Sequence, residues 1–155
     1  MASLTYEQGR DEILAAFKAA WDTTGSVVDP KTEAPLGSVP VAVWDGVEPD
    51  GVRPHSQPWA RVTVRHTDGA GQRTLGEAGL RRFDRSGLVT VQVFVPKGQG
   101  VTLADRLCKI AAEAFEGRHT PGGVWFRNVR MREVGPDGPW VQHNVVAEFT
   151  YDELK

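Results

Sequence analysis

The feature that most constrains the fold is a run of alternating valines in the middle of the chain. Four valines occupy every second position, separated by polar residues (Val89, Val91, Val93 and Val95, with Thr90 and Gln92 between them). Successive side chains of a β-strand point to opposite faces, so this pattern indicates a strand with one apolar face. Together with the residues before it, the run predicts a long strand over 80–95, kinked at Ser86-Gly87.

A second alternating segment, residues 59–67, predicts the pairing partner of this strand. Its small apolar residues point one way and its polar residues point the other (Ala60, Val62 and Val64 against Trp59, Arg61, Thr63 and Arg65). We expect the two segments to form an antiparallel hairpin whose tip is the glycine-rich loop 68–79. A loop of that length within a compact domain is typically functional or disordered.

Two segments show helical spacing instead. Thr5 and Gln8 have the spacing of a capping box, and the apolar residues after them predict a helix over about 6–22 (Ile13, Leu14, Phe17, Ala20 and Trp21). Thr102 and Asp105 have the same spacing before a second apolar face, which ends at Gly117 (Leu103, Leu107, Ile110 and Ala114).

The last third of the chain predicts two more strands, 124–134 and 140–151, around the turn 135–139. One face of the final strand is apolar apart from a histidine (Val141, His143, Val145, Ala147, Phe149 and Tyr151). Residues 29–58 hold six of the ten prolines, so we expect an irregular connection there, with one short extended piece over Val39–Trp44.

These elements follow the order α-β-β-β-α-β-β. The pattern predicts a single α+β domain over 1–155, with one mainly antiparallel or mixed sheet and both helices packed on one face. A lone Cys108 can form no internal disulfide, and no apolar run is long enough to span a bilayer. The first 17 residues are broken by charges, so we expect no signal peptide, no membrane association and synthesis in the cytoplasm.

A search for catalytic and ligand-binding motifs predicts no catalytic, cofactor-binding or metal-ligating residues. The four histidines lack HExxH spacing, and the chain has neither a CxxC pair nor a GxSxG motif. The glycine-rich PKGQG segment (96–100) lacks phosphate-loop spacing and is interpreted as a tight strand-to-helix turn. His143 and Cys108 are interpreted as core residues.

Charge is segregated along the sequence. Residues 1–52 carry three Lys or Arg against nine Asp or Glu, residues 53–132 carry fourteen against six, and residues 133–155 carry one against five. Arginine is favoured at protein interfaces because its planar fork pairs with carboxylates. We therefore predict that the arginines of the hairpin tip and of the 59–67 strand form an interface with another protein subunit (Arg73, Arg81, Arg82, Arg85, Arg61 and Arg65). Arg127, Arg130 and Arg132 extend the basic region.

The order of these segments resembles a known family. Its marks are a Pro-Trp-x-Arg-Val-Thr-Val strand, an Arg-Arg-x-x-x-x-Gly-Leu-Val-x-Val-Gln-Val-Phe-Val-Pro run, an Ala-Asp-x-Leu-x-x-Ile-Ala helix, a Gly-Val-x-Phe strand and a Trp-x-Gln-x-Asn-Val strand (58–64, 81–96, 104–111, 123–126 and 140–145). The layout is similar to the tail terminator proteins of long-tailed phages (siphoviruses), prophages and gene transfer agents. The likeness covers nearly the whole chain and is weakest over 22–57.

The resemblance implies a structural virion protein with no enzyme activity and no cofactor. Such proteins assemble with copies of themselves into a ring, usually a hexamer, on the head-proximal end of the tail tube. The ring contacts the tail tube protein, stops tube polymerisation and offers the joining surface for the neck or head-completion protein. DNA passes through its lumen without specific binding. The protein would assemble in the host cytoplasm and reside in the virion tail.

Three alternatives remain open on the sequence. A head–tail connector or other neck subunit would have similar size and composition. A nucleic-acid-binding module would use the arginine-rich face of the sheet, and its affinity would fall steeply with salt. A small enzyme with an unrecognised site would need a pocket with convergent titratable residues.

Overall fold

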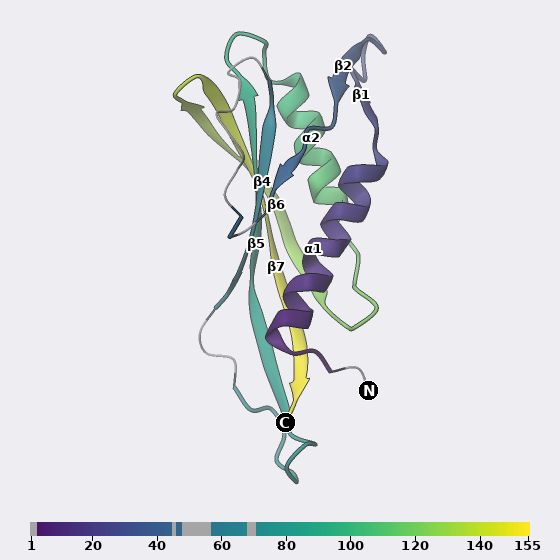
Figure 1. Ribbon diagram of the computed structural model, residues 1–155, viewed down its shortest axis with the longest axis vertical. Helices are drawn as coiled ribbons and strands as arrows, with labels where there is room; N and C mark the ends of the chain where they lie inside the picture. Colours follow the sequence, from purple (N-terminus) through teal and green to yellow (C-terminus); the bar gives the residue numbers. More distant parts are fainter. Residues whose placement is uncertain (1–2, 45, 48–56, 68–70) are drawn as a thin grey trace.

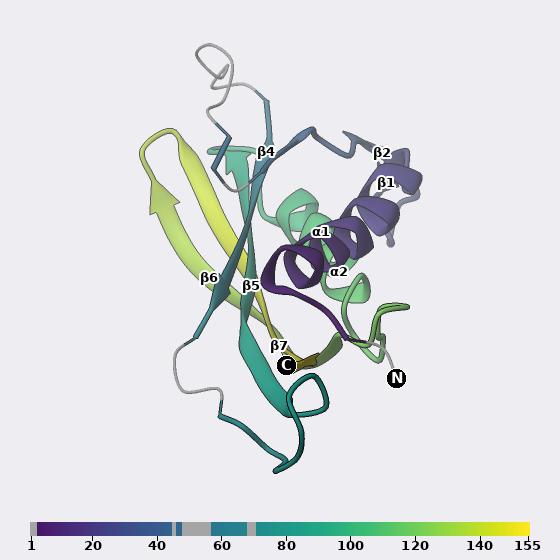
Figure 2. The same ribbon diagram turned by 60° about the horizontal axis from the view of Figure 1, so that its bottom comes forward.

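The computed structural model describes residues 3–44, 46–47, 57–67 and 71–155, and the fold of these residues is α+β. Two helices and seven strands follow in the order α1 (Tyr6–Thr23), β1 (Ser26–Val28), β2 (Pro35–Ser38), β3 (Ala42–Val43), β4 (Trp59–His66), β5 (Arg82–Pro96), α2 (Thr102–Glu113), β6 (Trp125–Asp137) and β7 (Trp140–Leu154). Both helices lie on the same side of the main sheet, as predicted (Figures 1 and 2).

The main sheet has the strand order β3-β4-β5-β7-β6 and is mixed. β4 pairs with β5, β5 with β7 and β7 with β6, all antiparallel, whereas β3 pairs with β4 in parallel. The predicted hairpin of the 59–67 and 80–95 segments is therefore confirmed. β5 and β7 form the long centre of the sheet, and every residue of β5 from Arg82 to Pro96 faces a β7 partner.

β5 runs through the predicted kink at Ser86-Gly87 without a register shift against β7, and the kink itself stays a prediction. A side chain at Gly87 would meet the carbonyl oxygen of Arg65 on β4 and the ring of Phe149 on β7. The glycine therefore allows the two neighbouring strands to approach β5 closely at this position.

The capping box of α1 is confirmed, since Thr5 Oγ1 accepts from the Gln8 amide at 3.3 Å and the Gln8 side chain accepts from the Thr5 amide at 3.0 Å. The helix buries Ile13, Phe17 and Trp21 against the sheet and α2. Trp21 Nε1 donates to the carbonyl oxygen of Pro40 at 2.7 Å, which fixes the chain leading into β3.

The predicted start and face of α2 need correction. No side chain caps the helix, because Thr102 is its first residue and Val101 takes the cap position. The buried face is formed mostly by small residues, and Ile110 is only partly buried (Leu103, Ala104, Leu107, Cys108, Ala111 and Ala112). Small side chains let the axis of α2 lie close to the valines of the sheet. Which side of α2 is buried therefore depends on how closely its side chains pack against the sheet, more than on their size.

The segment predicted to be irregular, residues 29–58, is partly structured where the structure describes it. β2 lies within it and pairs antiparallel with β1, so the two form a short ribbon beyond the C-terminal end of α1 (Figure 1). The predicted extended piece Val39–Trp44 contains β3, whose parallel pairing makes the sheet mixed. Residues 48–56 lie outside the described residues.

Candidate interaction surface

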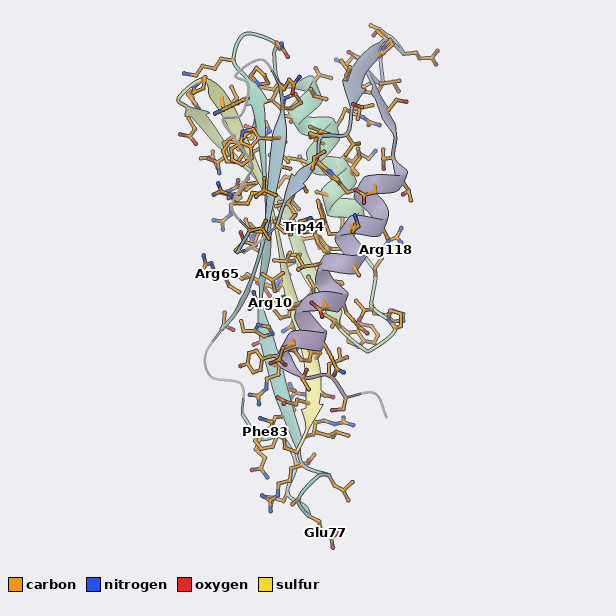
Figure 3. All side chains as sticks on the ribbon, viewed as in Figure 1. Arg10, Trp44, Arg65, Glu77, Phe83 and Arg118 are labelled. Atoms are coloured by element: carbon orange, nitrogen blue, oxygen red, sulfur yellow. The ribbon has the colours of Figure 1, made fainter. Side chains whose placement is uncertain are left out.

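The sheet face opposite the helices carries two rows of arginines. Arg61 and Arg65 lie on β4, and Arg127, Arg130 and Arg132 lie on β6. Figure 3 shows Arg65 pointing away from the side occupied by α1. Between the two rows, β5 and β7 contribute mainly polar or short side chains (Thr90, Gln92, Asn144, Val146 and Glu148). The face therefore has basic margins and a less charged centre.

A β-bulge places the β6 arginines on one face. Arg127 pairs with Glu148 and Arg130 with Val146, so β6 advances three residues while β7 advances two. Asn128, within the bulge, adopts a left-handed backbone with φ 51°. Without the extra residue, the two-residue period of a strand would send Arg127 and Arg130 to opposite faces.

The tip of the β4–β5 hairpin projects from the body of the molecule. Its described part, residues 71–81 (called the arm below), extends beyond the C-terminal end of β7, with Glu77 at its far end (Figures 1 and 3). Leu75 is 95% exposed and Leu80 is 68% exposed. The two leucines, with Leu154 of β7, line a shallow apolar hollow. Grouped exposed leucines on a projecting segment are typical of a contact with another molecule.

The tip arginines predicted to meet a partner make contacts within the chain. Arg73 pairs with Asp84, Arg82 pairs with Asp152 at 3.3 Å, and Arg85 pairs with Glu153 at 2.6 Å. Arg81 Nε donates to the carbonyl oxygen of Gly76 at 2.8 Å. The Arg73 pair joins the arm to β5, and the Arg82 and Arg85 pairs join β5 to β7 at the root of the arm.

The six predicted interface arginines thus fall into different environments. Arg61 and Arg65 are exposed on the outer face, and Arg73 and Arg81 are exposed on the arm. The Arg82 side chain is partly buried, whereas that of Arg85 is only 13% exposed and faces the helix side of the sheet. Their role at an interface stays a prediction. The exposed Leu75 was missed because a leucine in a glycine-rich loop has no periodicity that indicates its surroundings, and Leu80 was missed because it was assigned to the predicted strand, which begins only at Arg82.

Two aspartates face each other at the root of the arm. Asp84 and Asp152 are direct cross-strand partners on β5 and β7. Burial and the hydrogen bond with Asp84 raise the pKa of Asp152, while Arg82 and Arg73 oppose that effect. Like charges that face each other across a strand pair are destabilising, and the two arginines offset the repulsion between the aspartates.

A polar cluster lies beneath the first turns of α1. His66 Nε2 and the Tyr151 hydroxyl share a hydrogen bond of 2.7 Å, and the Tyr6 ring lies 4.2 Å from that of His66. Burial, then the nearby charges of Arg10 and Arg85, lower the pKa of His66. Burial raises the pKa of Tyr151 to about 12. The imidazole of His66 is therefore held in its neutral form, with Nε2 hydrogen-bonded to Tyr151.

We expect this histidine to make the fold less stable in mild acid. As the pH falls through about 6.5, the unfolded chain takes up a proton at His66 that the folded chain resists, so the free energy of unfolding decreases. Urea unfolding at pH 7.5 and 5.5 would measure this decrease. His66→Asn should reduce it, whereas His119→Asn, at an exposed position, should leave it unchanged. An equal decrease in wild type and His66→Asn would contradict the assignment.

The residues interpreted as core positions are buried. Cys108 is fully buried, and burial together with Asp105 raises the pKa of its thiol to about 12. It therefore stays a protonated thiol with no nucleophilic character at neutral pH. His143 is also buried. Among the described residues, no helix has the length and apolar character needed to cross a membrane.

A hollow of about 560 Å³ lies on the helix side of the molecule. It is lined by α1, by the segment that follows α2 and by the start of β6 (Glu12, Ala15, Ala16, Ala19, Ala20 and Thr23, then Ala114, Arg118, His119, Thr120 and Pro121, and Phe126). Arg118 lies beside α1 in Figure 3. This surface, called the alanine groove below, is separate from the arm and from the outer sheet face.

Comparisons with known proteins inform the fold only. No protein-family model and no curated protein matches the chain. Seventeen chains from solved structures match it. One, whose name gives no function, has 19% sequence identity and a TM-score of 0.53, and the match covers 92% of this chain and 94% of that one. At this identity the likeness shows a shared fold, extending over nearly the whole of both chains.

Proposed function

We propose that this protein is a phage tail terminator, a ring-forming subunit at the head-proximal end of the tail tube. In this proposal it catalyses no reaction and uses no cofactor. It stops tube polymerisation and presents a joining surface to the neck or head-completion protein. Its partners are the tail tube protein and other copies of itself, six to a ring by analogy with the family it resembles. It would reside in the virion after assembly in the host cytoplasm.

The observation that carries the proposal is the projecting arm with its exposed Leu75 and Leu80. Leaving two large apolar side chains in water at the end of an ordered arm is unfavourable, and burial against a partner removes that cost. The ion pair of Arg73 with Asp84 and the backbone hydrogen bonds from the Arg73 and Arg81 amides to the carbonyl oxygens of Arg82 and Lys155 hold the arm in a defined position. An arm that is already ordered loses little conformational entropy on binding.

A ring also needs two different complementary surfaces on each subunit. A contact repeated by rotation joins one surface of a subunit to a different surface of the next, until the ring closes. The arm and the alanine groove form such a pair: two leucines project from one, and the other is a hollow of about 560 Å³ lined by alanines of α1 together with Glu12 and Arg118. In the proposed ring, the arm of each subunit occupies the groove of its neighbour.

The separation of charge supports distinct roles for the two faces. The exposed basic side chains of β4 and β6 lie on the outer sheet face, whereas α1 exposes the acidic Glu7 and Asp11 on the other side. Contact between the basic margin of one subunit and these carboxylates of its neighbour favours one orientation of the two subunits over the reverse.

Electron microscopy and mass photometry of the pure protein test whether it forms a ring. Imaging of phage particles made without the protein tests whether it acts at the head-proximal end of the tail. We expect closed rings of one stoichiometry and, in its absence, over-long tails. Tailless heads beside finished tails of normal length would instead indicate a head–tail joining protein. A strictly monomeric protein whose loss leaves tail length and head joining unchanged would refute the proposal.

A further inference from the structure

Three side chains with metal-ligating atoms meet where α2 crosses the β6–β7 pair. Asp105 lies in the first turn of α2, Glu133 on β6 and His143 on β7. One potential ligand atom from each lies within 4.8 Å of those of the other two. Glu133 and His143 are direct cross-strand partners, so their relative position is fixed by the sheet register.

His143 is the member that calls for an explanation. The residue is only 4% exposed, and its ring faces a carboxylate of the same cluster. Its Nδ1 lies 3.5 Å from Asp105 Oδ1, within ion-pair distance. Imidazole is among the commonest metal ligands in proteins and can bind through either ring nitrogen.

The spacing of these atoms fits a small divalent cation. Zinc binds imidazole nitrogen and carboxylate oxygen at about 2.0–2.2 Å in a tetrahedron, which separates neighbouring ligand atoms by roughly 3.4 Å. The distance from His143 Nδ1 to Asp105 Oδ1 already has about that length. Glu133 is exposed, so a change of its rotamer can bring its carboxylate into place.

We propose that Asp105, Glu133 and His143 form a binding site for a divalent transition-metal ion, with Zn²⁺ as the best fit. One imidazole and two carboxylates suit zinc, and water would complete the tetrahedron at this partly exposed position. Because the three ligands come from three elements, the ion would join the first turn of α2 to the β6–β7 pair. The site stabilises the fold and is independent of the proposed ring.

Cobalt is the probe that reports the site directly, because tetrahedral Co²⁺ absorbs visible light strongly. Metal-free full-length protein would be titrated with Co²⁺ and then with Zn²⁺, and thermal unfolding would be recorded with and without Zn²⁺. We expect a saturable visible band with one equivalent of Co²⁺, its displacement by Zn²⁺, and a higher Tm with Zn²⁺.

Variants separate this site from adventitious binding. Glu133→Gln, at an exposed position, and His143→Asn should each weaken Co²⁺ binding by at least about tenfold and remove the Tm increase. The matched controls Glu116→Gln and His119→Asn should bind as the wild type does. If Glu133→Gln folds normally and binds Co²⁺ with unchanged affinity, or if the wild type shows no saturable band, the proposed site is wrong.

Discussion

Replacing Gly87 with alanine is expected to lower the free energy of unfolding by about 3 kcal/mol, the upper part of the usual range for an overpacked core. The added Cβ would contact the carbonyl oxygen of Arg65, lie 2.6 Å from Cζ of Phe149, and lie 2.8 Å from Cα of His66. Two of these neighbours are backbone atoms of β4, so relief requires moving a strand. Gly87 lies at the point where β4, β5 and β7 are in register.

Gly76→Ala is the matched control, because nothing lies within 4 Å of the position that its methyl group would take and its φ is not left-handed. We expect that variant to stay within about 0.5 kcal/mol of wild type, as exposed substitutions usually do. In thermal unfolding the Gly87 variant should melt roughly 10 °C lower. Equal melting temperatures for the two variants would show that β4 and Phe149 are not tightly packed at Gly87.

The strands and helices could be predicted from the sequence because their patterns are periodic. The valines of β5 and the alternation in β4 identify both strands and their apolar faces, and Thr5 with Gln8 identifies the start of α1. The β1–β2 ribbon could not be predicted in this way. Each of its strands has at most four residues, too few for a period to be recognised, and β2 begins at Pro35.

Features that depend on the register between strands far apart in the sequence could not be predicted either. The pairing of Arg82 with Asp152 and of Arg85 with Glu153 joins residues about 70 positions apart, which become neighbours only once β5 and β7 are aligned. The bulge at Asn128, which places Arg127 with Arg130, has the same origin. The sequence therefore identified the arginine-rich region but not which of its members are already paired within the chain.

Changing both Leu75 and Leu80 to aspartate is expected to abolish ring assembly while leaving the subunit folded. Burial of one leucine side chain contributes about 1.5–3 kcal/mol, so losing two should weaken each subunit contact by about 3 kcal/mol or more, over a hundredfold in affinity. Both side chains are exposed in the subunit, so its Tm should stay near the wild-type value. Mass photometry would measure assembly, with Val28→Asp on β1 as the control for added charge.

A mixing experiment tests whether the alanine groove receives the arm. Ala19→Glu places a charge in the groove at an exposed position of α1 and should also prevent rings. The leucine variant keeps an intact groove, and the Ala19 variant keeps an intact arm. Each variant alone should be monomeric, but their mixture retains one functional arm and one functional groove, so it should form heterodimers that grow no further. If Ala19→Glu alone still forms complete rings, the arm binds elsewhere; if the mixture stays monomeric while both variants are folded, the two surfaces are not partners.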